Sequence, residues 1–215
     1  MNFSVDEITN KWGRPTTFRS APADRFEKYA GVVPNLLLSV WQELGFSGFY
    51  DGLYWICDPA EWQSVVDEWT SELDLQFGRD EWSAVTRSAF GTMDLWGRRT
   101  GMSLTIVPYY GMILPVDNTG RMINDFERDL QILAAFTSTS HETLDPDGDD
   151  DRPLFRRVFN RLGPVDFDSM YGFVPVPALG GEMLPERVEI LDAEVHMHLL
   201  SQVTPRTLLV NNPYR

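Results

Sequence analysis

The histidine, cysteine and serine residues of this chain are the first candidates for chemistry, because such residues bind metals or act as nucleophiles. His196 and His198 lie two residues apart in a segment predicted to be helical, so their side chains point to different faces. No other histidine or cysteine completes a zinc-binding set, and the lone Cys57 has the apolar neighbours of a buried thiol. Ser47, in "GFSGF", lacks the final glycine and the preceding strand of a nucleophile elbow. These residues therefore predict neither a metal centre nor a catalytic nucleophile.

Carboxylates are gathered in two short segments. Residues 51–82 and residues 125–151 each hold nine acidic residues and one basic residue, so each segment carries a charge of −8. The 215-residue chain has a net charge of −14, which leaves +2 for the remaining residues. In "DPDGDDD" the carboxylates alternate as in an EF-hand, but Asp150 takes the place of its glycine and Arg156 that of its glutamate. The loop therefore does not predict a calcium site of this type.

Paired carboxylates, such as Asp51 and Asp58, are also the groups that acid–base catalysis and metal binding need. Acids are so frequent in segment 51–82 that such pairs arise by chance. A small-molecule enzyme or a metal-dependent enzyme that uses these carboxylates stays open as an alternative function. It predicts a concave pocket that holds at least two of them with perturbed pKa values.

The negative charge also bears on partners and location. It repels phosphate backbones, so direct nucleic-acid binding is not expected, whereas it attracts a basic protein and speeds the encounter. The simpler explanation is that an acidic surface keeps the protein dissolved. The sequence has no apolar run of about 18 residues and does not begin like a signal peptide, so we expect a cytoplasmic protein that does not enter a membrane.

The elements that position these groups begin with helices and continue into a sheet. "SVDEITNKWG", "ADRFEKYAG" and "VPNLLLSVWQELGF" predict three helices, and "GLYWIC" (residues 52–57) predicts a strand. Asp58 begins a fourth helix, in which Trp62, Val65, Val66 and Trp69 form an inward stripe and the acids face solvent. Four β-rich runs between residues 84 and 116 predict an antiparallel meander.

The second half of the chain is predicted to be mostly helical. Helices are expected over residues 122–136 and 153–163, joined by the polar, exposed or mobile connector "TSTSHETLDPDGDDDRP". Residues 163–183 predict an irregular apolar loop, which a last helix over residues 190–203 covers. We expect an α+β fold with an antiparallel sheet of four to six strands, N-terminal helices packed on it, and a mostly helical C-terminal part. The expected domains are residues 1–118 and residues 119–215, packed together.

Several motifs carry a family resemblance. "KWGRPT", "ELGFSGFYDGLYWICDPAEW", "TRSAFGTMDLWG" and "MSLTIVPYYGMI" together resemble the GAD-like domain over roughly the first 115 residues. "DPDGDDDRPLFRRVFNRLG", with the later "AEVHMHLLSQ", is similar to the domain that accompanies it in bacterial immunity proteins. Proteins of this type resemble cognate immunity proteins of type VI secretion toxins, notably DNase toxins. A looser likeness connects the helix and "GF" entry into the sheet with a wider superfamily of small immunity proteins and cell-wall regulators.

The resemblance implies no catalytic activity and no cofactor, and it implies a protein that occludes or distorts a toxin. A DNase presents a basic groove to DNA, so clustered carboxylates can dock there while a few aromatic or arginine anchors supply affinity. The predicted partner-binding residues, chosen by charge and by expected exposure beside glycine-rich turns, are Tyr50, Asp51, Glu61, Asp67, Glu68, Tyr109, Tyr110, Asp145, Asp147, Asp149, Asp150 and Asp151. A scaffold protein with an unrelated partner remains a third possibility.

Overall fold

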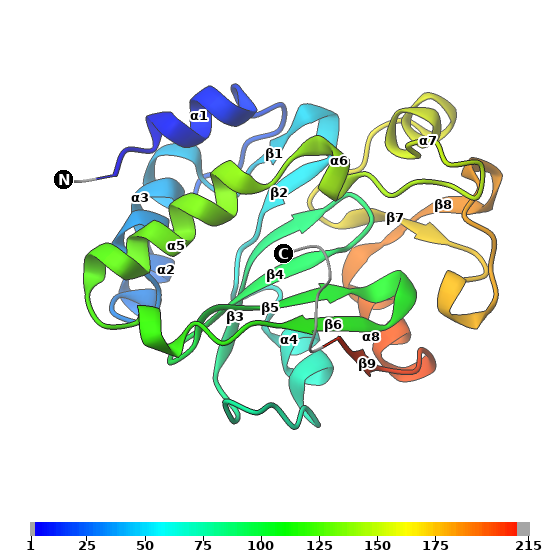
Figure 1. The fold of residues 1–215 in the computed structure, drawn as a ribbon. Coiled ribbons are helices and arrows are strands. Elements are labelled where there is room, and N and C mark those ends of the chain that lie inside the picture. The colour runs from blue at the N-terminus through cyan, green and yellow to red at the C-terminus, as the bar shows by residue number, and fades with distance from the viewer. Residues whose placement is uncertain (1–2, 210–215) are drawn as a thin grey trace.

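The fold is a mixed α+β structure built on one long sheet. The computed structural model describes residues 3–209 of the chain. Seven strands lie in the order β1-β2-β3-β4-β5-β6-β9, and every neighbouring pair is antiparallel except β6 and β9, which are parallel (Figure 1). The strands are β1 (Gly48–Phe49), β2 (Tyr54–Ile56), β3 (Trp82–Ser88), β4 (Met93–Gly97), β5 (Gly101–Val107), β6 (Met112–Pro115) and β9 (Thr207–Leu208).

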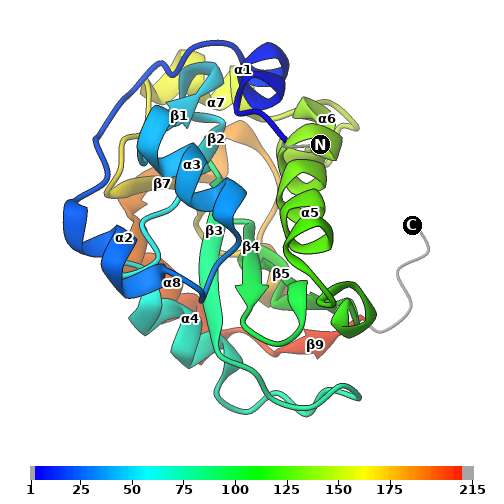
Figure 2. The same cartoon turned by 90° about the vertical axis from the view of Figure 1, so that its left-hand side faces the viewer.

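Helices cover both faces of this sheet. On one face α5 (Asp125–Ser138) packs against β5, and it also contacts α1 (Asp6–Trp12) and α3 (Asn35–Leu44). On the other face α4 (Gln63–Thr70) packs against β3 and against α8 (Ala193–Val203) (Figures 1 and 2). The short helix α2 (Ala23–Tyr29) precedes α3. No helix within residues 3–209 has the length and apolar character needed to cross a bilayer.

A smaller unit, formed by residues 141–192, lies beside the sheet. It contains α6 (His141–Leu144), α7 (Phe155–Leu162) and a separate antiparallel pair of strands, β7 (Ser169–Phe173) and β8 (Val188–Asp192) (Figure 1). The predicted irregular loop over residues 163–183 is therefore wrong in part, because β7 lies within it. Five short 3₁₀ turns complete the part of the chain that the structure describes, and η1 (Tyr50–Gly52) connects β1 to β2.

Tryptophan side chains form much of the core and also fasten distant segments to one another. The indole of Trp69, in α4, donates to the carbonyl of Met197 in α8 at 3.1 Å. Trp96, in β4, donates to the carbonyl of Val32 at 3.0 Å, ahead of α3. Both rings are fully buried, as the inward stripe on the predicted fourth helix led us to expect for Trp69. Each buried ring therefore keeps its polar N–H satisfied, which removes a large desolvation penalty.

The sheet is larger than predicted. Its two extra strands, β1 and β9, have two residues each, which is too short for any periodic pattern to reveal. The predicted strand over residues 52–57 begins later, because Tyr50, Asp51 and Gly52 have positive φ angles of 52°, 57° and 91° and form η1 instead. Since β9 pairs with β6, the sheet contains residues from both sides of the predicted boundary at 118/119. That boundary stays a prediction.

Candidate functional site

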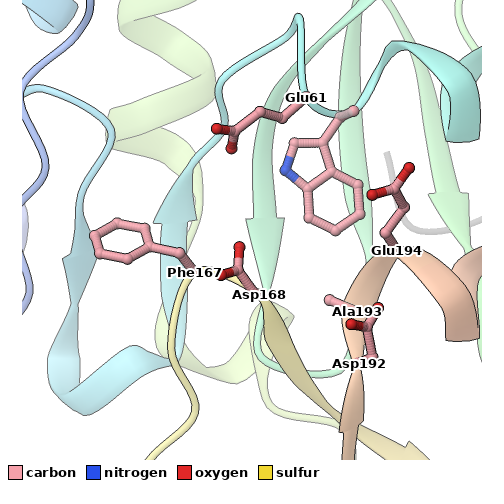
Figure 3. Close-up of a pocket in the computed structure, with 7 residues that line it drawn as sticks. Glu61, Phe167, Asp168, Asp192, Ala193 and Glu194 are labelled. Carbon is pink, nitrogen blue, oxygen red and sulfur yellow. The ribbon is translucent and has the colours of Figure 1, made fainter.

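An acidic pocket opens where the segment before α4 meets the β8–α8 junction. Its volume is about 210 Å³. Four carboxylates and two aromatic rings surround it (Figure 3), and the lining residues are Glu61, Trp62, Phe167, Asp168, Asp192, Ala193 and Glu194. No lysine or arginine lines this hollow. A cationic side chain is therefore the group that its chemistry favours.

Local structure explains why the acids gather there. Asp192 caps α8, since its carboxylate accepts from the backbone N–H of Val195 at 2.9 Å, a position that helix N-termini favour. The backbone N–H of Ala193 donates to the carbonyl of Asp168 at 2.9 Å, which ties the start of β7 to the start of α8. Glu61 accepts from Arg19 at 2.5 Å. Within residues 3–209, no cation lies within ion-pair distance of Asp168 or Asp192.

A buried arginine supports the wall of the pocket. Arg87, in β3, is only 2 % exposed and donates to the backbone carbonyls of Asp166 and Phe167, each at 3.0 Å. Its guanidinium lies over the rings of Trp55 and Trp62, at 4.9 and 5.5 Å from their centroids. Burial lowers the pKa of Arg87 to about 10, so the group stays charged at neutral pH. The cation thus fixes the chain just before β7, where the pocket begins.

Two predicted residues lie on α4, Glu68 at the contact with α8 and Asp67 in the lining of a different hollow. The carboxylate of Glu68 is hydrogen-bonded to His198 and accepts from Gln202 at 2.9 Å. These bonds, with His198 the larger contributor, lower the pKa of Glu68. Asp67 is exposed and accepts from the side chain of Gln63 at 2.7 Å. The structure therefore brings Glu61 to the pocket and Glu68 to the adjoining helix pair, as part of one acidic face.

Tyr50 and Asp51 belong to a different cluster, at the tip of the β1–β2 hairpin. The ring of Tyr50 stacks on His141 with a centroid separation of 3.8 Å. Asp51 forms an ion pair with Arg156 at 3.0 Å, and the Arg156 guanidinium lies 5.8 Å from the centre of the Tyr50 ring. Both hairpin residues have left-handed backbone angles, which cost side chains other than glycine roughly 1–2 kcal/mol each. Contacts across the hairpin tip therefore hold a strained turn in place.

The acidic loop before α7 is largely exposed, as composition predicted, but hydrogen bonds hold it in a defined turn. Asp145 accepts from the backbone N–H groups of Leu154 and Phe155, at 2.9 and 2.6 Å, and so caps the start of α7. Its pKa is raised, mainly because the carboxyl is partly removed from water. Asp149 accepts from the backbone N–H of Met183 at 3.0 Å. These two carboxylates organise the loop more than they offer charge to a partner.

Asp150 is also engaged within the chain. It forms ion pairs with Arg152 at 2.6 Å and with Arg157 at 2.9 Å. Hydrogen bonds from Arg157 and then from Arg152 lower the pKa of Asp150 to about 2. Asp147 and Asp151 are exposed, and neither forms an ion pair within residues 3–209. The second acidic segment therefore presents less unpaired charge than its composition implies.

Of the two predicted tyrosines after β5, Tyr110 has the exposure that the sequence led us to expect and Tyr109 does not. Tyr109 is only 9 % exposed, and its ring packs 5.5 Å from that of Phe173 in β7. Burial raises its pKa to about 12. Tyr110 is 39 % exposed, and its hydroxyl contacts the sulfur of Met183 at 2.6 Å. The turn around Gly111 exposes only the second ring, so Tyr109 offers a partner almost no surface.

Comparison with known proteins assigns the chain to a family. Residues 4–109 match the model of the GAD-like domain. Residues 133–204 match the model of the type VI secretion system (T6SS) immunity protein Tdi1, C-terminal. The chain belongs to the GAD-like immunity protein family.

The fold of this GAD-like immunity protein also resembles a solved structure. The crystal structure of Atu4351 from Agrobacterium tumefaciens superposes with a TM-score of 0.85 at 20 % sequence identity, over 95 % of this chain and 91 % of that one. At this identity the likeness concerns the fold alone. A search of curated protein sequences gave no significant match.

The acidic pocket and the cluster at the hairpin tip each contain residues from both matched regions. In the pocket, Glu61 and Trp62 come from the GAD-like region, and the other lining residues come from the Tdi1 C-terminal region. At the hairpin tip, Tyr50 and Asp51 likewise meet His141 and Arg156 across the same junction. These two candidate binding surfaces therefore depend on both regions being present.

Three carboxylates of the pocket were not among the residues predicted from the sequence. Asp168, Asp192 and Glu194 lie between residues 152 and 215, where seven acids balance seven bases, so a count of charge along the chain passes over them. One signal was present. Asp is a residue that helix N-caps favour, and Asp192 directly precedes α8, whereas the predicted helix over residues 190–203 began earlier and placed Asp192 inside it.

The enzyme alternative predicted a hollow with two or more carboxylates of segment 51–82. A hollow of about 390 Å³ has Asp67, Asp80 and Glu81 in its lining. Asp80 accepts from the backbone N–H groups of Arg99 and Thr100, at 2.9 and 2.8 Å, so its position is explained by the β4–β5 turn that it holds. Within residues 3–209, no group of three or more histidine, cysteine or acidic side chains could hold a metal ion. We find no observation that favours catalysis there.

Proposed function

We propose that this protein binds and neutralises a cognate nuclease toxin of a type VI secretion system in the cell that produces the toxin. The observation that carries the proposal is the match of residues 133–204 to a T6SS immunity protein. Membership of that family supports an immunity role against a secreted toxin. The nuclease character of the toxin and direct binding to it are our inference from charge.

The charge of the protein supports a basic partner. The net charge is −14, and the pocket beside α8 gathers four carboxylates of which Asp168 and Asp192 have no ion-pair partner within residues 3–209. A nuclease must hold phosphates with lysine and arginine side chains, so its active surface is complementary to such a pocket. Opposite charge of this kind speeds encounter and rejects acidic proteins, while buried anchors supply most of the affinity.

The proposed target also suggests where the protein acts. A nuclease that attacks the chromosome must be stopped where the DNA is, so we propose that the immunity protein works in the cytoplasm. No activity or cofactor of its own is needed, because stoichiometric occupation of the toxin suffices.

A binding experiment tests the proposal. The protein would be co-expressed with the toxin encoded by the neighbouring reading frame, an inactive toxin variant being used if needed, and one partner would carry a purification tag. We expect an equimolar complex at physiological salt, and loss of DNA cleavage when active toxin meets the purified protein. An unrelated acidic protein of similar net charge is the control, and it should leave cleavage intact. Absence of a complex at physiological salt would refute the proposal.

A further inference from the structure

Helix α8 carries apolar side chains on its outward face as well as its inward face. Its inner side buries Met197 and Leu200 against the rest of the protein. Its outer side exposes Val195, Leu199 and Val203, which are 66 %, 51 % and 42 % accessible. We call these three residues the outer stripe. They follow one another at intervals of four residues, so they are neighbours along one face of the helix.

Such a stripe is unusual on a helix that has already buried one apolar face. The solvent side of a surface helix is ordinarily polar, and a contiguous exposed apolar patch marks an interaction surface more often than an isolated residue does. Other sides of α8 are covered, because α4, β7 and β8 pack against this helix. Nothing within residues 3–209 covers the outer stripe.

The charges around α8 indicate what covers it. The acidic pocket lies at the N-terminal end of the helix, where Asp192 and Glu194 line it (Figure 3). Val195 follows Glu194 directly in α8. Along the side that meets α4, Glu68 contacts His198 and Gln202. The one arginine that contacts α8 from its C-terminal side, among the residues that the structure describes, is Arg206, which donates to the carbonyl of Ser201 at 3.2 Å. The helix therefore runs from a negative pocket along an apolar surface, and its complement is an apolar segment that is basic at one end.

We propose that the outer stripe of α8, continued by the acidic pocket, is the surface on which the cognate toxin docks. This inference rests on the proposed function, because it names the surface that captures the toxin. The toxin contributes an apolar segment that lies along Val195, Leu199 and Val203, and a lysine or arginine beside it enters the pocket. The apolar contacts hold the complex together and the carboxylates speed its formation.

A pair of matched variants tests the surface. Leu199→Asp places a charge in the middle of the outer stripe, whereas Ile123→Asp makes the same change at a residue that is 73 % exposed and lies ahead of α5. Both side chains are exposed, so both variants should unfold with the urea midpoint of the wild type. We expect Leu199→Asp to raise the Kd for the toxin at least about tenfold, and Ile123→Asp to change it less than about twofold.

A third variant tests the pocket. Asp168→Asn keeps the shape of the side chain and removes its charge. We expect the association rate with the toxin to fall about two- to threefold at low salt, and the difference to vanish at about 1 M salt, where charges are screened within about 3 Å. The dissociation rate should change little. An association rate equal to that of the wild type at low salt would remove the pocket from the proposed surface.

The outcomes separate the inference from the function on which it rests. If the wild type binds the toxin and Leu199→Asp binds equally well, the docking surface is wrong and the immunity function stands. If the wild type does not bind, the proposed function fails and the surface fails with it. If sedimentation shows a wild-type dimer that Leu199→Asp converts to a monomer without loss of toxin binding, a second copy of this chain covers the stripe and our assignment is overturned.

Discussion

Arg87 shows how a single residue can decide the shape of a site from beneath it. The side chain is buried, and no carboxylate within residues 3–209 lies within ion-pair distance. Four backbone carbonyls, of which those of Asp166 and Phe167 are nearest, and two tryptophan rings provide the compensation that a buried cation requires. Nothing in the run "AVTRSAFG" indicates that this arginine points inward. The pattern of this run predicts a strand. It does not predict that Arg87 points inward, because the nearest carbonyls that accept from it belong to a loop distant in the sequence.

Replacement of this arginine should therefore be costly. Arg87→Ala leaves a void and four backbone carbonyls without this donor, so we expect the free energy of unfolding to fall by about 3–5 kcal/mol. Arg98→Ala is the control, because Arg98 is exposed and its ion pair is with the exposed Glu81, so its loss should cost less than about 1 kcal/mol. Urea denaturation measures both. A cost below about 1 kcal/mol for Arg87→Ala would show that the buried cation does not hold the pocket wall.

A second prediction at the scale of the residue concerns Asp150. Its pKa in the folded protein is about 2, below the ordinary value of 3.8, because Arg157 and Arg152 donate to the carboxylate. A lowered folded pKa means that the ionised group stabilises the fold above pH 3.8, and that this contribution is lost as the pH falls from 3.8 towards 2. In Arg157→Gln the pKa should move up towards 3.8, as followed by an NMR titration of the side-chain carboxyl. In Arg156→Gln it should stay where it is, since Arg156 pairs with Asp51 instead.

At the scale of the element, α1 depends on one side chain. Trp12 donates from its indole to the carbonyl of Phe136 in α5 at 2.8 Å, and its ring stacks on that of Tyr54 in β2 at 4.4 Å. The helix has seven residues, too few to be stable alone in water. Packing of Trp12 is therefore what attaches α1 to α5 and to the sheet.

Shortening this side chain in two steps separates the hydrogen bond from the packing. Trp12→Phe keeps an aromatic ring and should lower the free energy of unfolding by about 1 kcal/mol, whereas Trp12→Ala should lower it by about 3–5 kcal/mol. Hydrogen exchange should accelerate first in the amides of α1, because the helix detaches before the sheet opens. Equal costs for the two variants, or α1 amides that exchange no faster than those of β4, would disprove this role.

How far an element could be predicted depended on its length and on the distance to its partner. Leu37, Val40, Trp41 and Leu44 repeat at helical spacing and all are buried, so α3 was predictable from local pattern. The antiparallel meander over β3 to β6 was predictable for the same reason, since short runs and glycine turns follow one another directly. By contrast, β7 pairs with a strand 15 residues further on, measured from Phe173 to Val188, and its five residues lie between glycines and prolines that predict a loop. Pairing at such a distance leaves no trace in a local window.

The candidate site divides along the same line. The helical period placed Glu61 and Glu68 on the solvent side of the predicted fourth helix. In the structure Glu61 lies in the segment before α4 and lines the pocket, and Glu68, in α4, contacts α8. The helical period could not place Asp168, which reaches the pocket through the β7–β8 pair. The glycine turn next to Tyr109 predicted exposure, but the ring turns inward to Phe173. The local pattern therefore predicted the acidic residues in and just before α4. It did not predict Asp168, which tertiary strand pairing brings to the pocket.

At the scale of the whole molecule, charge is concentrated where the two matched regions meet. In the second acidic segment Asp150 pairs with Arg157 of α7, and backbone N–H groups engage Asp145 and Asp149, whereas Asp147 and Asp151 form no ion pair within residues 3–209. In the pocket, Asp168 and Asp192 likewise have no ion-pair partner within these residues, and they lie at the junction of the two matched regions. We therefore expect the association rate with the toxin to fall steeply as salt rises, while the dissociation rate changes little. Stopped-flow measurements over a range of salt concentrations would show this. Equal association rates at low and high salt would mean that charge does not guide the encounter.

The most direct test is a titration of the toxin's DNA cleavage with this protein. If the protein captures the toxin through a specific surface, cleavage should fall in proportion to the protein added and cease at one equivalent. The Leu199→Asp variant should need a large excess, and an acidic protein of similar net charge should have no effect. Full cleavage in the presence of excess wild-type protein, or equal inhibition by the unrelated acidic protein, would contradict specific capture of the toxin.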